Sequence, residues 1–146
     1  DSPVYIPTDI YGLYGFRIDE GFLYAYRDSV LVFDISIPES PTYVSCLGVH
    51  DIGSMAVGDI YAYCECHTLR GDSARLEIFD VSDPVEPVHY STYDLPNLLW
   101  QLTLVDTVLY GAYRELHALD VSNVDSIVYY GGIYPVFGYS SGAFSS

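Results

Sequence analysis

The sequence predicts an all-β fold built from repeated, four-stranded antiparallel sheets. One motif carries most of this prediction: an apolar strand ending in Asp-(Val/Ile)-Ser occurs three times, with its aspartates at Asp34, Asp80 and Asp120. β-Branched and aromatic residues dominate the segments between turns, as they do in strands. The chain shows no amphipathic helical stripe with capping residues. The motif aspartates are 46 and 40 residues apart, which leaves room for four short strands in each repeat.

In the first repeat, residues 10–49, apolar runs alternate with turn residues. The acidic turn Asp19-Glu20-Gly21 contains the residue types that tight hairpins prefer. The motif Asp34-Ile35-Ser36 ends an apolar run, and Pro38 and Pro41 then stiffen the connection to the next strand. The predicted strands are residues 13–19, 22–27, 30–35 and 42–49.

The second repeat, residues 50–95, and the third, residues 96–132, follow the same order. In each copy a tyrosine-containing strand precedes the motif strand, and we align Tyr24, Tyr61 and Tyr110 as equivalent. The strands predicted for these two repeats are residues 52–57, 60–66, 75–81, 88–93, 98–105, 108–114, 116–121 and 126–131.

The aspartates and serines of the motif are assigned a structural role. A carboxylate at the end of a strand can accept hydrogen bonds from the backbone N–H groups of the following turn, and a serine two residues later can do the same. Capping therefore explains these side chains more simply than acid–base chemistry does. The turn residues are Asp34, Ser36, Asp80, Ser82, Asp120 and Ser122.

The hydrophobic pattern predicts sheets that are covered on both sides. The run Val30-Leu31-Val32-Phe33 is apolar on both alternating faces, so its sheet needs a neighbour on each side. Four antiparallel strands repeated every ~40–45 residues are typical of β-propeller blades, which stack around an axis. Residues 1–146 are treated as a single repeat domain with about three blades, too few to close a ring, since four to eight are usual. Residues 133–139 match residues 10–16, so residues 133–146 begin a further strand or form a tail.

The motif residues resemble a known repeat. Phe79-Asp80-Val81-Ser82-Asp83-Pro84-x-x-Pro87 and residues 33–41 look like the LVIVD repeat of secreted and surface-attached bacterial and archaeal propellers. The third copy, residues 119–125, lacks both prolines of that pattern. The resemblance implies a β-propeller in an extracellular or cell-surface setting. It implies no catalytic residues that could be carried over to this chain.

Charge excludes several classes of partner. The chain has 20 acidic residues against five arginines and no lysine, for a net charge of −15. Such a field repels nucleic-acid backbones and anionic membrane surfaces. No apolar run approaches the ~20 residues of a spanning helix, so membrane insertion is not expected. The chain opens at Asp1 rather than Met, as a processed protein or an internal segment would.

Aromatic residues are abundant, with 16 tyrosines and a single tryptophan, Trp100. A tyrosine-rich surface suits protein contact or carbohydrate stacking, because the ring is apolar and the hydroxyl can reach water. The alternative is that aromatic residues simply favour strands. Trp100 could line a channel as a stacking platform, but its large apolar area favours packing between blades.

The cysteines and histidines suggest metal or disulfide chemistry only weakly. The three cysteines, Cys46, Cys64 and Cys66, cannot all pair within the chain, although one disulfide from Cys46 to either partner is compatible with the sequence. Cys64-x-Cys66 followed by His67 invites a metal interpretation, but no second ligand pair follows. The other histidines, His50, His89 and His117, fall at unrelated repeat positions. Calcium at Asp80-x-Ser82-Asp83 would find too few local oxygens, so no cofactor is predicted.

The second repeat contains Arg70-Gly71-Asp72 in its longest hairpin. On an exposed loop this tripeptide could present a guanidinium and a metal-coordinating carboxylate to an adhesion receptor. Gly-Asp is equally what a turn selects.

These features predict a non-enzymatic extracellular module that assembles into a ring, surface layer or filament. The expected partners are other copies of the chain or further blades of a longer chain. The alternative is a fragment of a larger surface propeller that binds a glycan, peptide or cation. No Gly-x-Ser-x-Gly, His-Glu-x-x-His or phosphate loop recommends an enzyme.

Overall fold

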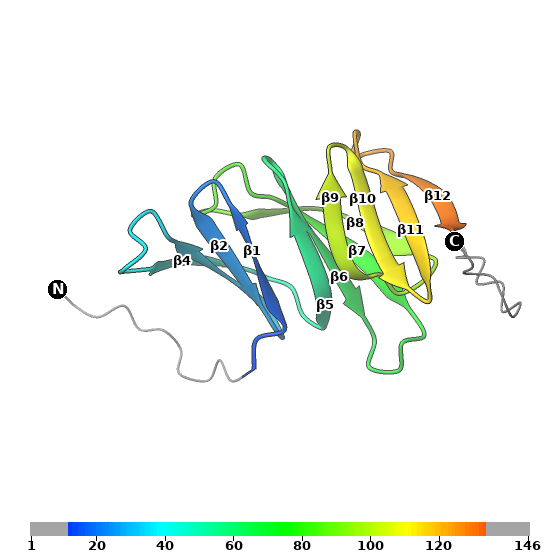
Figure 1. Ribbon diagram of the computed structural model, residues 1–146, viewed down its shortest axis with the longest axis horizontal. Helices are drawn as coiled ribbons and strands as arrows, with labels where there is room; N and C mark the ends of the chain where they lie inside the picture. Colours follow the sequence, from blue (N-terminus) through cyan, green and yellow to red (C-terminus); the bar gives the residue numbers. More distant parts are fainter. Residues whose placement is uncertain (1–11, 134–146) are drawn as a thin grey trace, which may run out of the picture.

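The computed structural model describes residues 12–133, which form three four-stranded antiparallel sheets without a helix (Figure 1). In each sheet the strands lie in chain order. The first sheet consists of β1 (Gly15–Asp19), β2 (Phe22–Tyr26), β3 (Val30–Asp34) and β4 (Thr42–Leu47). The second consists of β5 (Ile52–Val57), β6 (Tyr61–His67), β7 (Ala74–Asp80) and β8 (Val88–Leu95). The third consists of β9 (Trp100–Val105), β10 (Val108–Tyr113), β11 (Glu115–Asp120) and β12 (Val128–Ile133).

The predicted all-β class and the four-strand repeat are confirmed. Every strand bound lies within two residues of the predicted one, because strand alternation and turn residues are local signals. The first hairpin shows this directly: Glu20 and Gly21 have φ of 44° and 82°, as the two central residues of a type I′ turn require. Residue 133, where a further strand was predicted to begin, instead ends β12 of the third sheet, and residues 134–146 lie outside the described part of the chain.

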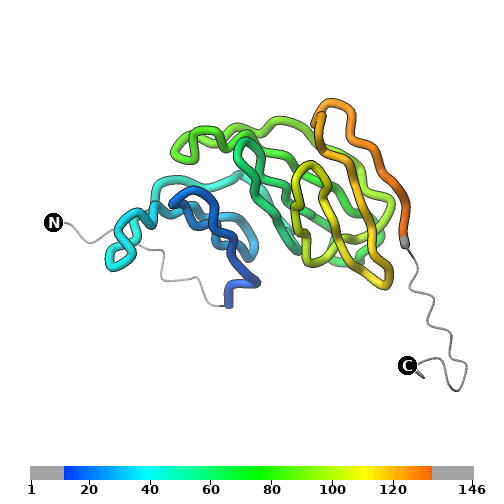
Figure 2. The backbone as a smooth tube through the Cα atoms, turned by 45° about the horizontal axis from the view of Figure 1, so that its top comes forward, coloured from blue at the N-terminus to red at the C-terminus, as the bar shows by residue number. Residues whose placement is uncertain are grey.

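The middle sheet is covered on both faces. One apolar core lies between the first and second sheets, where Tyr24 and Val32 meet Met55, Cys64 and Phe79. A second core lies between the second and third sheets, formed by residues that include Leu76, Ile78, Leu102, Leu109 and Leu119. Figure 2 follows the chain from one sheet to the next along the stack. The double-sided burial predicted from the apolar motif strands is therefore realised in the second sheet.

The innermost strand of each sheet lies close to those of its neighbours. β5 contacts both β1 and β9, and Ser54 Oγ of β5 donates a buried hydrogen bond to the Leu99 carbonyl at 2.9 Å. Arg17 of β1 reaches past the second sheet, and its guanidinium donates to the Leu102 carbonyl of β9 at 3.3 Å. The three first strands thus converge, whereas the sheets as a whole form an open stack rather than a closed ring within residues 12–133 (Figures 1 and 2).

The register corrects one detail of the repeat alignment. Tyr24 pairs with Val32, which lies two residues before the motif aspartate. The same relation holds for Tyr63, which pairs with Ile78, and for Tyr110, which pairs with Ala118. The second tyrosine in the repeat is therefore Tyr63 and not Tyr61. The Tyr-Ala-Tyr pattern lies two residues earlier in β6 than in β2, and the hydrogen-bonded ladder reveals this displacement.

Candidate functional site

The motif aspartates close the turn after the third strand of each sheet. Asp34 Oδ1 accepts a hydrogen bond from the Ser36 amide at 2.8 Å. Asp80 Oδ1 accepts from both the amide and the hydroxyl of Ser82, at 2.9 and 2.6 Å. Asp120 Oδ1 accepts from the Ser122 amide at 2.9 Å. The bonds from Ser82 lower the pKa of the Asp80 carboxyl, because they stabilise its charged form.

The third copy makes the same turn without the prolines. The Ser126 amide donates to the Asn123 carbonyl, just as the Glu86 amide donates to the Asp83 carbonyl in the second copy. Asn123 also caps this turn, because its side-chain oxygen accepts from the Asp125 amide at 3.0 Å. The prolines of the first two copies are therefore dispensable for the turn geometry.

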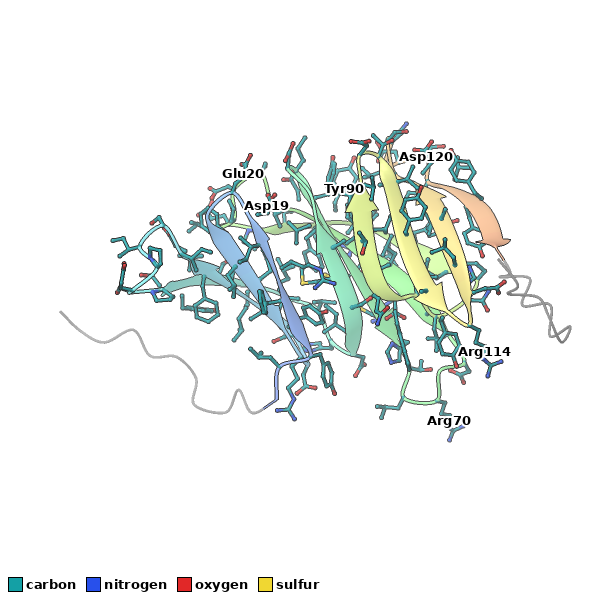
Figure 3. The ribbon with its side chains drawn as sticks, viewed as in Figure 1. Asp19, Glu20, Arg70, Tyr90, Arg114 and Asp120 are labelled. Carbon is teal, nitrogen blue, oxygen red and sulfur yellow. The ribbon has the colours of Figure 1, made fainter. Side chains whose placement is uncertain are left out.

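The Arg-Gly-Asp segment lies exposed in the β6–β7 hairpin. Gly71 has a φ of 67°, and its amide donates to the Thr68 carbonyl at 2.8 Å. The Thr68 hydroxyl donates a short hydrogen bond to the Asp72 carboxylate. Arg70 projects from the end of the molecule opposite Asp19, Glu20 and Asp120 (Figure 3). The Asp72 carboxylate is thus used within the turn, and adhesion stays a prediction.

The cysteines are not joined in a disulfide. Cys64 and Cys66 are fully buried in the first core, whereas Cys46 is exposed. Burial raises the pKa of Cys66 to about 12, so its thiol stays protonated at neutral pH. His67, which the metal interpretation placed beside these cysteines, contacts Glu65 instead. No group of three or more His, Cys, Asp or Glu side chains in residues 12–133 is arranged to hold a metal.

The buried or half-buried carboxylates that the sequence prediction missed include Glu77 and Glu65. Glu77 accepts from Arg75 Nε at 2.6 Å, from His89 Nε2 at 2.7 Å and from the Thr92 hydroxyl at 2.6 Å. Burial opposes ionisation of Glu77, but these hydrogen bonds outweigh it and lower its pKa. Because the partners come from two strands, no local pattern in the sequence announces this cluster.

Glu65 is the second of these carboxylates, and it adjoins a cavity. Its side chain is completely buried, Oε2 lies 3.2 Å from His67 Nδ1, and Oε1 has no hydrogen-bond partner among the described residues. Burial raises the pKa of Glu65, and the hydrogen bond with His67 opposes that shift. His67 and Trp100 line a cavity of about 460 Å³. Trp100 is 46% exposed, so the packing between sheets favoured for it is not what the structure shows.

The outer sides of the stack are two apolar sheet faces. We call the side of the first sheet turned away from the second the N-terminal face. There Ile18, Leu23 and Phe33 form one row across β1, β2 and β3, and Phe16 is 56% exposed beside them. We call the corresponding side of the third sheet the C-terminal face. Its exposed apolar residues include Val105, Leu116, Val128 and Tyr130.

The C-terminal face is hollowed. A recess of about 570 Å³ is lined by residues of β9, β10 and β11, among them Trp100, Ala112, Tyr113 and Leu116. The two faces and the cavity are the features of this structure that a partner or ligand could use. Among residues 12–133, no helix is long and apolar enough to cross a membrane.

Comparison with protein families and with curated proteins found no match to this sequence. The resemblance to the LVIVD repeat accordingly rests on the motif residues themselves and stays a prediction.

Proposed function

We propose that this chain is a non-enzymatic module of β-propeller type whose function is assembly. In this proposal the N-terminal face of one copy stacks on the C-terminal face of another. The observation that carries it is a row of three residues that recurs in every sheet, packs against a neighbouring sheet in two of them, and has no neighbouring sheet in the first, where Phe33 is 8% exposed and Ile18 is 58% exposed.

The recurring row is defined by strand register. In the second sheet Val57, Ala62 and Phe79 form the row, and in the third it consists of Leu104, Leu109 and Leu119. These rows pack against the first and second sheets, respectively. The matching row of the first sheet is Ile18, Leu23 and Phe33. Ile18 is 58% exposed there, although its counterparts Val57 and Leu104 face a neighbouring sheet.

On the C-terminal face too, a residue whose counterparts are buried by a neighbouring sheet has no such neighbour. By register Leu116 corresponds to Val30 and Leu76, and both of these are fully buried against the next sheet. In the third sheet no next sheet is present within the described residues, and Leu116 borders the recess instead. Burying apolar side chains contributes about 25 cal/mol per Å² of covered surface. Stacking two copies would therefore supply each face with the cover that the second sheet already has.

The geometry of such a contact is head-to-tail. A contact between two different faces makes a ring if its rotation closes and a filament or layer if it does not. Two copies would bring together six sheets, which falls within the usual range of propellers. The motif residues that resemble the LVIVD repeat support an extracellular or cell-surface setting for this assembly. No cofactor forms part of the proposal.

A second candidate is a ligand-binding part of a larger propeller. In that case further sheets of the same polypeptide would cover both faces, and the cavity beside His67 would be the binding site. The observation that favours this candidate is the cavity itself. The two candidates differ in molecular mass: the natural polypeptide would be several sheets longer than 146 residues, and it would be monomeric.

Light scattering and sedimentation of the 146-residue chain test the assembly. We expect particles heavier than the 16.3 kDa monomer, with a mass that rises with concentration. Ile18→Glu should abolish this association, because it places a charge in the apolar row. Ile37→Glu is the matched control: Ile37 is 61% exposed in the β3–β4 turn, and its replacement should leave the association intact.

The particle mass, and the comparison of Ile18→Glu with Ile37→Glu, decide whether the chain self-assembles through the N-terminal face. A monodisperse 16.3 kDa monomer at all concentrations would exclude self-assembly. Equal association of both variants would show that the N-terminal face is not the contact. The intact mass of the natural polypeptide then tests the second candidate separately.

A further inference from the structure

The cavity beside His67 is assembled from all three sheets. It opens where the innermost strands begin: Tyr14 precedes β1, Ile52 and Gly53 start β5, and Trp100 starts β9. The remaining wall residues come from the β2–β3 hairpin, the position before β5, the end of β6 and the β6–β7 hairpin, namely Arg27, Asp28, Asp51, His67 and Leu69. Its volume of about 460 Å³ lies within the range of small-molecule sites.

A buried side chain holds one polar wall of this cavity in place. Glu65 lies behind the wall with no exposed surface, and its carboxylate engages His67 Nδ1. When Nδ1 of an imidazole donates to a carboxylate, Nε2 can act as a hydrogen-bond acceptor. Gly53 makes room for the pair, since a Cβ at that position would come within 2.5 Å of Glu65 Oε2 and 2.7 Å of His67 Cε1.

Removing the Glu65 carboxylate from water costs free energy, and the other two sheets have no carboxylate at the equivalent position. Taking a charged group out of water costs several kcal/mol unless its partners compensate. Here one oxygen has a partner and the other, Oε1, has none within the described residues. The positions equivalent to Glu65 in the other two sheets are Tyr26 and Ala112. A hydrophobic residue thus occupies this position in the other sheets, whereas Glu65 interacts with His67 and with the Leu99 backbone.

Trp100 supplies an apolar part of the cavity wall. Its indole is held edge-to-face by Tyr113, with ring centroids 5.2 Å apart and planes inclined at 61°. Almost half of its surface remains accessible. Tryptophan gains considerably when its faces are covered. A rigid, half-exposed indole beside hydrogen-bonding groups suits a ligand with one apolar face and a polar rim, which describes a pyranose ring.

Charge disfavours an anionic ligand. The net charge of −15 repels anionic ligands, and Asp28 and Asp51 in the wall do so at short range. The Arg27 guanidinium lies 3.6 Å from Asp28 and offsets one of the two wall carboxylates. The remaining polar groups, two carboxylates, a guanidinium and an imidazole, can each accept from or donate to hydroxyl groups.

We propose that this cavity is a binding site for neutral saccharides, in which a pyranose ring stacks on Trp100 and a hydroxyl donates to His67 Nε2. Asp28, Asp51 and Arg27 bind the other hydroxyls at the rim. The site lies at the end of the stack where β1, β5 and β9 begin, and His67 and Glu65 belong to the middle sheet. The proposal therefore stands independently of whether the two outer faces assemble.

Because Trp100 is the only tryptophan, its fluorescence reports on this site directly. The probes are methyl glycosides of glucose, galactose, mannose and N-acetylglucosamine, together with their neutral disaccharides. At least one of these should change the emission of the full chain in a saturable way. Glucosamine and a sulfated disaccharide serve as cationic and anionic comparisons, and both should bind at least tenfold more weakly than the neutral probe.

Substitutions test which residues bind the probe. Affinity is measured by calorimetry, because Trp100→Ala and Trp100→Phe remove the fluorescent reporter. Trp100→Ala should weaken binding of the neutral probe at least tenfold, and Trp100→Phe should restore most of it, since a ring can still stack. His67→Ala should also weaken it. Tyr90→Ala is the control: Tyr90 is an exposed aromatic residue of β8 that does not line the cavity, and its replacement should leave affinity unchanged.

Three outcomes would overturn the proposal. They are no saturable fluorescence change with any neutral probe, preferential binding of the charged sugars, or equal loss of affinity in Trp100→Ala and Tyr90→Ala. The fluorescence titration uses the unaltered protein, so the proposal can be refuted even if a variant fails to fold.

Discussion

At the scale of single residues, this protein uses carboxylates in two opposite ways. Asp80 is solvated and accepts two hydrogen bonds from Ser82, which lowers its pKa. Glu65 is buried with one unpartnered oxygen, which raises its pKa. The first arrangement suits a turn that must hold its shape. The second places a carboxylate against His67, beside the cavity proposed as a binding site.

Replacing Asp80 tests the turn. Asp80→Ala removes the acceptor of both Ser82 bonds and should lower the free energy of unfolding by less than about 1 kcal/mol, because solvent screens the charge. Asp80→Asn keeps an acceptor oxygen and should cost less. Chemical denaturation at neutral pH measures both. Identical stability of Asp80→Ala and the unaltered protein would show that the motif aspartate does not support the turn.

The same turn should respond to pH in a defined direction. The folded-state pKa of Asp80 lies below its ordinary value of 3.8. Its contribution to stability is therefore present above pH 3.8 and is lost as the pH falls through the lower, folded-state value. The difference in free energy of unfolding between the unaltered protein and Asp80→Ala should accordingly shrink as the pH falls below 3.8, which chemical denaturation at a series of pH values measures.

At the scale of strands and turns, the sequence predicted where each strand lies along the chain but not which residues pair between neighbouring strands. The strands could be predicted because alternation, β-branched residues and turn residues act within a few positions of one another. The equivalence of Tyr63 with Tyr24 could not, because it depends on which residues pair across the β6–β7 hairpin. Hydrogen-bond pairing is a property of two strands together, so neither strand alone reveals it.

Close contact within the third sheet makes Gly111 a sensitive position. A Cβ there would come within 2.7 Å of Leu99 Cβ and 3.1 Å of Leu102 Cδ2. Because Leu99 Cβ is next to the backbone, it cannot move aside cheaply. Gly111→Ala should lower the free energy of unfolding by about 1–3 kcal/mol, as overpacked cores do.

Gly48→Ala is the control for this measurement. A Cβ at Gly48 meets no atom within 4 Å, so the change should be within about 0.5 kcal/mol of zero. Denaturant titration of Gly111→Ala and Gly48→Ala measures both changes in the free energy of unfolding. Equal stability of the two would mean that β10 can separate from the Leu99 segment without loss.

At the scale of the whole molecule, the decisive feature is the open stack. The second sheet has neighbours on both faces, whereas the first and third each present an apolar face without one. Acidic side chains such as Asp19, Glu20 and Asp120 gather at one end, and Arg70 and Arg114 lie at the other (Figure 3). Assembly must therefore bring together apolar surfaces that belong to two strongly negative molecules.

The salt dependence of association follows from this combination. Each chain carries a net charge of −15, so two chains repel one another at low ionic strength. Raising the salt concentration from about 0.01 to 0.15 M shortens the screening length from ~30 to ~8 Å, and association should strengthen. Sedimentation across that range measures it, with Ile18→Glu as a variant expected to stay monomeric throughout. Weakening by salt would indicate a contact made by ion pairs instead of the apolar faces.

By itself the sequence determined the all-β class, the three repeats, the strand bounds and the motif turns, because each depends on neighbouring residues. Only the tertiary structure showed that the first and third sheets have an uncovered apolar face, since coverage depends on what packs from elsewhere in space. It alone placed Glu65 behind His67 and Trp100 in an open cavity. Those contacts join residues of different strands and sheets, and no pattern along the chain encodes which of them will meet.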